Sequence, residues 1–205
     1  LKNWDYQYNQ KDIASTFFHK WLHTIEEYTW SDDFENNSIW PEIDKLEELI
    51  IYYPNSEWFD NKKTNDTELL IDICYQSFND VIKQYKQYSN LPDIDNYPDS
   101  IKYRTTDIMH LAKILDFSAL HLKTSGAKNI INATRKNEGP SFRYIIEMAN
   151  PYKIKGIYPG GQSGYPGSIY YDNFIQDWVN GEYYNLIFTS NNKFKGTELK
   201  CIPKY

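Results

Sequence analysis

The stretch from Gly139 to Phe188 constrains the fold most strongly, because its apolar residues alternate along the chain instead of recurring at helical intervals. Two alternating runs, residues 141–149 and 153–158, predict two β-strands, since side chains of a strand point to opposite faces in turn. Only Asn150-Pro151-Tyr152 separates the runs, so the strands should pair as an antiparallel hairpin. A glycine-rich loop, residues 160–167, follows. We therefore expect this stretch to build a sheet.

Apolar residues occupy both faces of the first predicted strand. Phe142, Tyr144, Ile146 and Met148 share one face, and Ile145 points to the other. We therefore expect both faces of the sheet to be partly covered.

The first half of the chain has the apolar spacing of helices and contains no glycine before Gly126. Apolar residues recur at intervals of three and four, which is typical of amphipathic helices. The predicted helices span residues 11–29, 38–53 and 67–88. Pro41 is expected in the first turn of the second helix. Asn65, Asp66 or Thr67 is expected to cap the third helix.

The remaining segments are shorter. Residues 105–123 are expected to be helical or mixed, and residues 126–133 a strand. Residues 171–179 predict a short helix that ends at Asn180-Gly181. Residues 186–188 and 199–202 predict a final hairpin.

These elements predict an α+β fold with a helical first half and a mostly antiparallel sheet in the second half. We expect a mainly helical segment over 1–125. Antiparallel strands and a short helix should follow over 126–205.

Composition narrows the function classes. The net charge is −6 and no basic stripe is present, which argues against nucleic acid as a partner. No apolar run approaches the ~20 residues of a membrane span. The 19 tyrosines, 10 phenylalanines and 6 tryptophans favour an aromatic core and interface. Two cysteines, Cys74 and Cys201, are too few for a disulfide scaffold or a metal cluster, and whether they pair is left open.

Gly160-Gly161-Gln162-Ser163-Gly164 suggests three interpretations. It lacks the lysine of a phosphate-binding loop. It also lacks the second glycine of a G-x-S-x-G nucleophile elbow, because Tyr165 stands there. A tight connection, in which glycine permits positive φ and close backbone approach, fits best.

Other candidate sites are weaker. Asp93, Asp95 and Asn96 lack the turn glycine and the distal glutamate of a calcium loop. His110 and His121 are expected to be packed, hydrogen-bonded residues. No order of serine, histidine and aspartate marks a triad, and no His/Cys spacing marks zinc. We expect no cofactor.

The motifs of the second half resemble the carboxy-terminal part of the penicillin acylase family of N-terminal-nucleophile hydrolases. The resemblance is specific over about residues 127–189 and co-linear, with fewer matches, over 1–126. It assigns a structural role to Gly139, Ser141, Arg143, Gly160, Gly161, Gln162, Ser163, Gly164, Pro166, Ser168, Tyr171, Asp172, Trp178 and Gly181. Ile169-Tyr170 depart from the Pro-His that the family often has there, so no role of that histidine is carried over.

The resemblance implies a part of a four-layer αββα sandwich, made by an α chain and a longer β chain cut from one precursor. The family nucleophile is the first residue of the β chain, whose own α-amine acts as base. Leu1 has neither hydroxyl nor thiol, so no catalytic residue is assigned here, and we expect the isolated chain to be inactive. The expected partners are the remainder of the β chain, the α chain and a small amide substrate.

Several expectations depend on the context of the chain. The N-terminus at Leu1 is expected to be a cut end, and the family suggests an exported parent protein. Arg143 is expected to brace the loop, by pairing with Asp172 or Glu147, or to face a substrate cleft. The isolated chain should self-associate through exposed sheet edges. The alternatives are a free-standing carbohydrate-binding module with tyrosines as stacking platforms, and a purely structural subunit; exposed aromatic side chains would favour the first.

Overall fold

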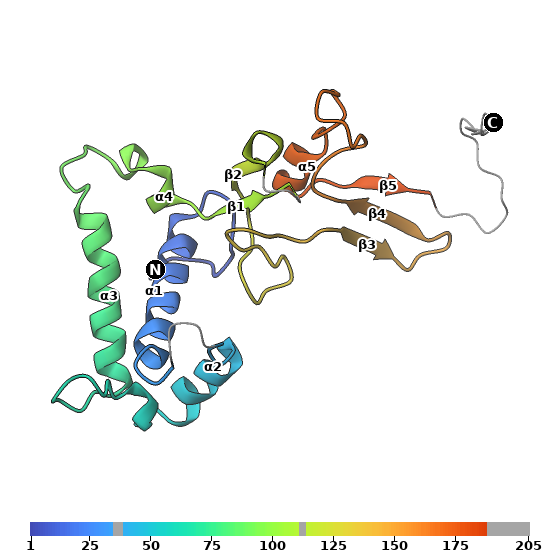
Figure 1. The fold of residues 1–205 in the computed structure, drawn as a ribbon. Helices are drawn as coiled ribbons and strands as arrows, with labels where there is room; N and C mark the ends of the chain where they lie inside the picture. Colours follow the sequence, from blue (N-terminus) through green and yellow to red (C-terminus); the bar gives the residue numbers. More distant parts are fainter. Residues whose placement is uncertain (35–38, 111–113, 188–205) are drawn as a thin grey trace, which may run out of the picture. The chain divides into compact units, whose positions relative to one another are not determined.

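The computed structural model describes residues 1–34, 39–110 and 114–187 (Figure 1). The chain forms two compact units, Leu1–Gly139 and Pro140–Tyr205. The units divide after Gly139, whereas the predicted segments divide after residue 125. The predicted last strand, residues 199–202, lies outside the described residues, as does Cys201. The fold is α+β, as predicted, with its long helices in the first unit.

Three helices dominate the first unit: α1 (Ile13–Trp30), α2 (Ile43–Tyr52) and α3 (Leu70–Lys86). They correspond to the three predicted helices. Shorter turns complete it: η1 (Glu57–Phe59), η2 (Ile94–Asn96), α4 (Asp99–Lys102) and η3 (Leu115–Phe117).

The helix starts differ from prediction in α2 and α3. Pro41 lies before the first turn of α2, because Glu42 is the N-cap. Leu69, and none of residues 65–67, precedes the first turn of α3, where the Asp72 carboxylate accepts from the Leu69 N–H at 3.0 Å. In the loop before α3, the Asp60 carboxylate accepts from the N–H of Glu68 at 3.1 Å, and this bond keeps Glu68 in the loop. The predicted place of Pro41 in the first turn of α2 and the predicted cap of α3 are therefore wrong.

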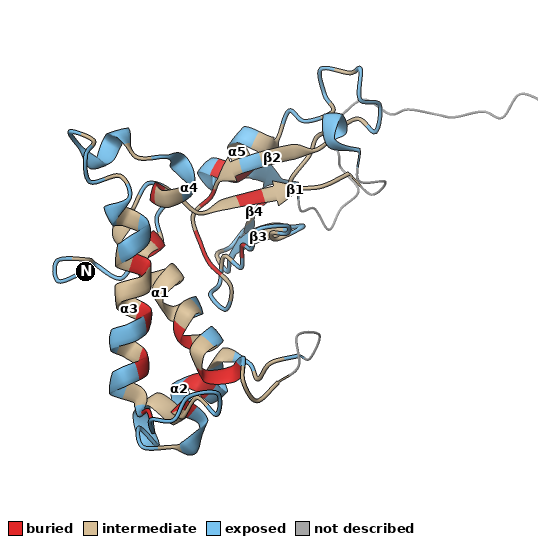
Figure 2. Cartoon of the chain, turned by 60° about the vertical axis from the view of Figure 1, so that its left-hand side comes forward, coloured by how far each residue is buried: buried red, intermediate tan, exposed pale blue. Residues whose placement is uncertain are grey.

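The core of the helical unit lies between α1, α2, η1 and α3. Its buried apolar residues are Ile25, Trp30, Leu46, Phe59 and Ile73. Figure 2 shows buried positions along α1 and α3 where the two helices face each other. Because each large apolar side chain contributes about 1.5–3 kcal/mol when fully buried, this cluster is the main source of stability for the helical unit.

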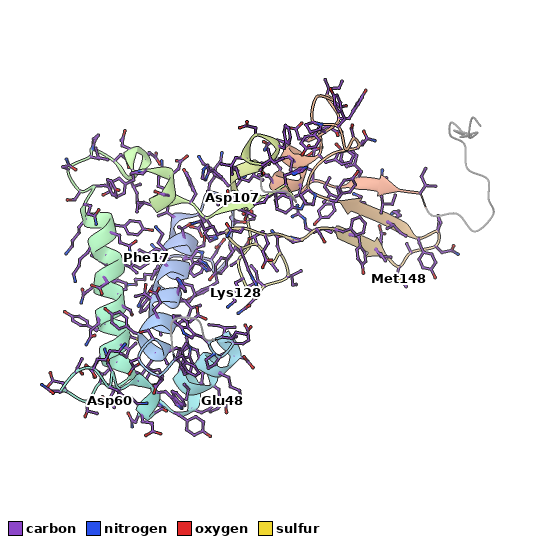
Figure 3. The ribbon with its side chains drawn as sticks, viewed as in Figure 1. Phe17, Glu48, Asp60, Asp107, Lys128 and Met148 are labelled. Carbon is purple, nitrogen blue, oxygen red and sulfur yellow. The ribbon has the colours of Figure 1, made fainter. Side chains whose placement is uncertain are left out.

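Aromatic and polar contacts fix α1 against α3. The Phe17 ring lies 5.3 Å from that of Tyr85 and 5.4 Å from that of Phe78 (Figure 3). The indole N–H of Trp21 donates to the hydroxyl of Ser77 at 3.0 Å. Ser77 is fully buried, so this hydrogen bond satisfies a polar group that would otherwise be costly.

The described residues of 105–123, which are 105–110 and 114–123, are not helical apart from the η3 turn. They form an antiparallel pair of strands, β1 (Thr105–Ile108) and β2 (Ala119–Lys123), in which Thr106 lies opposite Leu122. The Thr106 hydroxyl is buried and shares a 2.8 Å hydrogen bond with the Thr124 hydroxyl. Of the two expectations for this segment, helical or mixed, the mixed one is correct, because the pairing partner and not local spacing decides the conformation.

The predicted strand over 126–133 is absent. Gly126 (φ +98°) and Asn129 (φ +67°) adopt left-handed conformations that interrupt an extended chain. The amide of Asn132 donates to the Ser125 carbonyl at 2.8 Å, closing the segment as a loop. Ile131 is fully exposed, so the apolar pair Ile130-Ile131 does not mark a buried strand.

The second unit contains a three-stranded antiparallel sheet in the order β3-β4-β5. β3 (Arg143–Glu147) and β4 (Lys153–Ile157) form the predicted hairpin, with Tyr144 opposite Gly156. β5 (Tyr184–Leu186) joins the other edge of β4. Helix α5 (Ile175–Asn180) is shorter than predicted and ends at Gly181 (φ +74°), as expected.

This sheet is poorly covered by its own unit. Ile145 and Ile146 point to opposite faces, yet they are 53% and 45% exposed. In the described part of the unit, the buried apolar side chains are Ile157, Trp178 and Val179. Residues 140–187 therefore leave both faces of β3 about half exposed, whereas the sequence pattern predicts partial cover on both.

Candidate functional site

The glycine-rich loop of the second unit is a tight connection. Gly160 has φ +112°, a conformation that side chains disfavour. A Cβ on Gly161 would lie 2.5 Å from the carbonyl oxygen of Tyr171, and closer still to that of Tyr170. Glycine is needed here because two stretches of backbone meet.

The same loop is closed by hydrogen bonds. The N–H of Ser163 donates to the Tyr170 carbonyl at 3.0 Å, and that of Phe174 to the Gly160 carbonyl at 2.9 Å. The N–H of Gln162 donates to the amide oxygen of Asn173 at 3.1 Å. Backbone and amide groups thus hold the loop against the residues that lead into α5.

Arg143 on β3 contacts the end of α5. Its guanidinium donates to the Trp178 carbonyl and lies 4.9 Å from the Trp178 ring centre and 5.7 Å from that of Tyr183. The Trp178 indole N–H donates to the Pro140 carbonyl at 3.1 Å. Burial lowers the pKa of Arg143, yet a guanidinium stays charged at neutral pH. These contacts brace α5 against β3.

Other motif residues lie around this brace or apart from it. The expected partner Glu147 pairs with Lys153 at 3.2 Å. The Asp172 carbonyl accepts from the N–H of Ile175 at the start of α5. The Ser168 hydroxyl accepts from the N–H of Tyr170 at 3.2 Å. Gly139 belongs to the other unit.

Sequence reasoning missed a cleft of about 500 Å³ in the helical unit. One wall is α1, a second is the segment leading into α2, and a third is the loop 127–136. The residues that line it include Tyr8, His19, Leu22, His23, Glu26, Ile39, Trp40, Pro41, Glu42, Ile43, Ala127, Lys128, Asn129, Ile130, Thr134, Arg135 and Lys136. Figure 3 shows Lys128 in the loop beside α1. No sequence motif marks this cleft, because its walls come from three distant segments.

Two histidines of α1 line the cleft, and their pKa values are shifted in opposite directions. Burial, together with the nearby positive charge of Arg104, lowers the pKa of His19 to about 4, so this imidazole is neutral at pH 7. A hydrogen bond that the Nδ1 of His23 donates to the Glu26 carboxylate at 3.4 Å raises the pKa of His23. Across the cleft, Lys128 forms a 3.8 Å ion pair with Glu42.

Neither histidine that the sequence analysis singled out lies in this cleft. The His110 ring packs edge-on against Phe117, at 5.8 Å between ring centres. The His121 side chain is 82% exposed, so the expectation that it is packed is wrong. Its backbone has φ +55°, and its N–H donates to the carboxylate of Asp107 on β1 at 2.6 Å.

The described residues also bear on two other classes of site, metal centres and membrane-spanning helices. In ranges 1–34, 39–110 and 114–187, no three His, Cys, Asp or Glu side chains gather closely enough to hold a metal ion. No helix in those ranges is long and apolar enough to cross a membrane.

Comparison with known proteins connects the chain to one family. A family model described as penicillin amidase matches residues 1–194. The chain is 37% identical over 57 residues to an acyl-homoserine lactone acylase, QuiP, of Pseudomonas syringae pv. tomato. It is 35% identical over 57 residues to the protein of that name from Pseudomonas syringae pv. syringae. Each alignment covers 28% of this chain and 7% of the relative.

Proposed function

Because this chain belongs to the penicillin amidase family, we propose that it is the carboxy-terminal portion of the β chain of an amidohydrolase. The whole enzyme hydrolyses a linear amide through an acyl-enzyme. The nucleophile and the oxyanion-stabilising groups are supplied by parts of the parent protein outside this chain. The chain alone is inactive.

The observation that carries this proposal is the family match, which extends over residues 1–194. Two structural features support it. The close backbone contact at Gly161 and the Arg143–Trp178 contact are structural, since they hold backbone segments and α5 in place. The sheet β3-β4-β5 has apolar side chains on faces that residues 140–187 leave open, as expected for a sheet completed by other segments.

The proposed partners follow from the same reasoning. The remainder of the β chain and the α chain would cover the open faces of the sheet and contribute the reacting groups. Family resemblance suggests a β-lactam side-chain amide as one substrate class. Similarity to acyl-homoserine lactone acylases suggests an N-acyl homoserine lactone as the other.

The test compares the 205-residue chain with its full-length parent. Each is incubated with a chromogenic anilide and with an N-acyl homoserine lactone, and the released acid and primary amine are quantified. We expect an initial burst and turnover from the processed parent, and neither from the chain alone. A burst of acid from the chain alone would contradict the assignment of the nucleophile to another segment.

A second candidate is a carbohydrate-binding module. It is favoured by the exposure of several tyrosines, among them Tyr144 at 60% and Tyr165 at 71%. Rings on a binding platform should shift in NMR spectra when oligosaccharides are added. Unchanged tyrosine resonances would leave the hydrolase proposal as the better explanation of these exposed rings.

A further inference from the structure

We propose that the cleft between α1 and the loop 127–136 binds a small amphipathic carboxylate, with its apolar tail inside the cleft and its charge at Lys128. This inference concerns a site within this chain and does not depend on the hydrolase proposal. Four observations support it: fixed walls, an apolar lining, an excess of cations and a suitable volume.

The walls of the cleft are tied together by Arg104. Its guanidinium donates to the Ser15 hydroxyl on α1 at 2.7 Å and to the Gly126 carbonyl at 3.1 Å. The N–H of Gly126 donates to the Tyr8 carbonyl at 2.9 Å. Charge-assisted bonds of this kind are among the stronger ones in proteins. The first turn of α1 and the start of the loop are thus held at a fixed spacing, which lowers the cost of binding.

The far side of the loop is also anchored. The N–H of Asp107 on β1 donates to the Lys136 carbonyl at 2.6 Å. The N–H of Arg135 donates to the Glu138 carbonyl at 2.8 Å, which closes a tight turn. These bonds hold the cationic residues 135 and 136 at the rim of the cleft.

The lining supplies an apolar surface for a tail. Leu22, Trp40 and Ile43 pack on the core of the helical unit while still facing the cleft. Ile130 contributes from the opposite loop and is 41% exposed. Covering these side chains removes apolar area from water, which is worth about 25 cal/mol per Å².

The charges at the cleft favour an anion, although the whole chain has a net charge of −6. Three cations, Lys128, Arg135 and Lys136, line the cleft together with two carboxylates, Glu26 and Glu42. Arg135 is already paired with the Glu138 carboxylate at 2.8 Å, so Lys128 and Lys136 are the cations that can attract a ligand. The first carboxylate is already engaged by a histidine. The second carboxylate, Glu42, forms a 3.8 Å ion pair with Lys128. The Lys128 side chain is 41% exposed and the Glu42 side chain is 68% exposed. Such an exposed pair contributes about 0–1 kcal/mol, so a ligand carboxylate can replace it at little cost.

The volume selects a small molecule over a folded partner. About 500 Å³ lies within the range of about 300–1,000 Å³ that is usual for small-ligand pockets. An acid with a short alkyl or aryl tail would fill the space and leave its carboxylate at the rim.

The test uses isothermal titration calorimetry of the 205-residue chain with sodium octanoate. 1-Octanol has the tail without the charge, and acetate has the charge without the tail. We expect octanoate to bind at least about tenfold more tightly than either, since tenfold corresponds to about 1.4 kcal/mol. No saturable octanoate binding below about 5 mM, or equal binding of 1-octanol, would overturn the proposal.

Paired variants locate the binding. Lys128→Met removes the proposed cation, and Ile130→Asp places a negative charge on the apolar wall. Their controls are Lys45→Met, which breaks the comparable surface pair with Glu48, and Ile131→Asp, whose fully exposed side chain lies outside the lining. We expect each cleft variant to weaken octanoate about tenfold and each control to change it less than about twofold. Equal losses in a cleft variant and its control would refute the assignment.

Discussion

Replacing Gly161 by alanine should destabilise the second unit, because the added Cβ meets backbone and not a movable side chain. It would lie 2.5 Å from the Tyr171 carbonyl oxygen and closer to that of Tyr170. Either the loop or residues 170–171 must shift, which puts the 3.0 Å bond between Ser163 N–H and the Tyr170 carbonyl at risk. Overpacking typically costs about 1–3 kcal/mol. A lost hydrogen bond adds about 1 kcal/mol, so we expect a loss of at least about 2 kcal/mol.

Two neighbouring glycines provide matched controls. A Cβ on Gly164 would meet nothing within 4 Å, and this residue does not have positive φ. Gly164→Ala should therefore be neutral or stabilise by about 0.4–1 kcal/mol through the unfolded state. Gly160 also has open space, but its φ of +112° strains any side chain, so Gly160→Ala should cost about 1–2 kcal/mol.

Hydrogen exchange measured by mass spectrometry can follow peptides that span residues 174–180. The Phe174 amide donates to the Gly160 carbonyl and reports directly on the loop. A loss of at least about 2 kcal/mol speeds exchange by at least roughly 30-fold if it occurs through opening of this region. If Gly161→Ala exchanges no faster than Gly164→Ala, close backbone contact is not the reason for glycine at this position.

Three further predictions concern other contacts. Arg143→Ala in the whole enzyme should reduce the yield of soluble, processed protein, because α5 loses its contact to β3; normal folding with altered substrate preference would contradict this. Leu46→Ala should cost about 2–5 kcal/mol in urea unfolding, since Leu46 is fully buried, and a smaller loss would contradict its place in the core. The pKa of His19 is lowered from 6.5 to about 4, so the unfolded chain binds the proton more readily; the resulting stability is present above pH 6.5 and is lost as the pH falls towards 4. His19→Gln should remove this loss, whereas His23→Gln should not, because the pKa of His23 is shifted upwards.

Elements whose signals are local can be predicted from the amino-acid sequence alone. Helical spacing predicted α1, α2 and α3, and alternation predicted the β3–β4 hairpin around the Asn150-Pro151 turn. Gly181 marked the end of α5, because only a residue tolerant of positive φ fits there. The motifs of the second half also identified the family, which the match over residues 1–194 confirms. For the helices, the hairpin and the turn at Gly181, the interactions that fix the conformation join residues close in the sequence.

Features that depend on distant partners are not visible in any local pattern and emerge from packing in the folded chain. β1 and β2 are strands because they pair with each other, and local spacing over 105–123 does not reveal this. Arg104 gives no local signal, yet it connects α1 with Gly126 and so shapes the cleft that includes His19. The cleft is assembled from segments separated by most of the first unit. Periodicity predicts which face of a helix or strand is apolar. Which other element packs against that face depends on packing and hydrogen bonding in the folded chain.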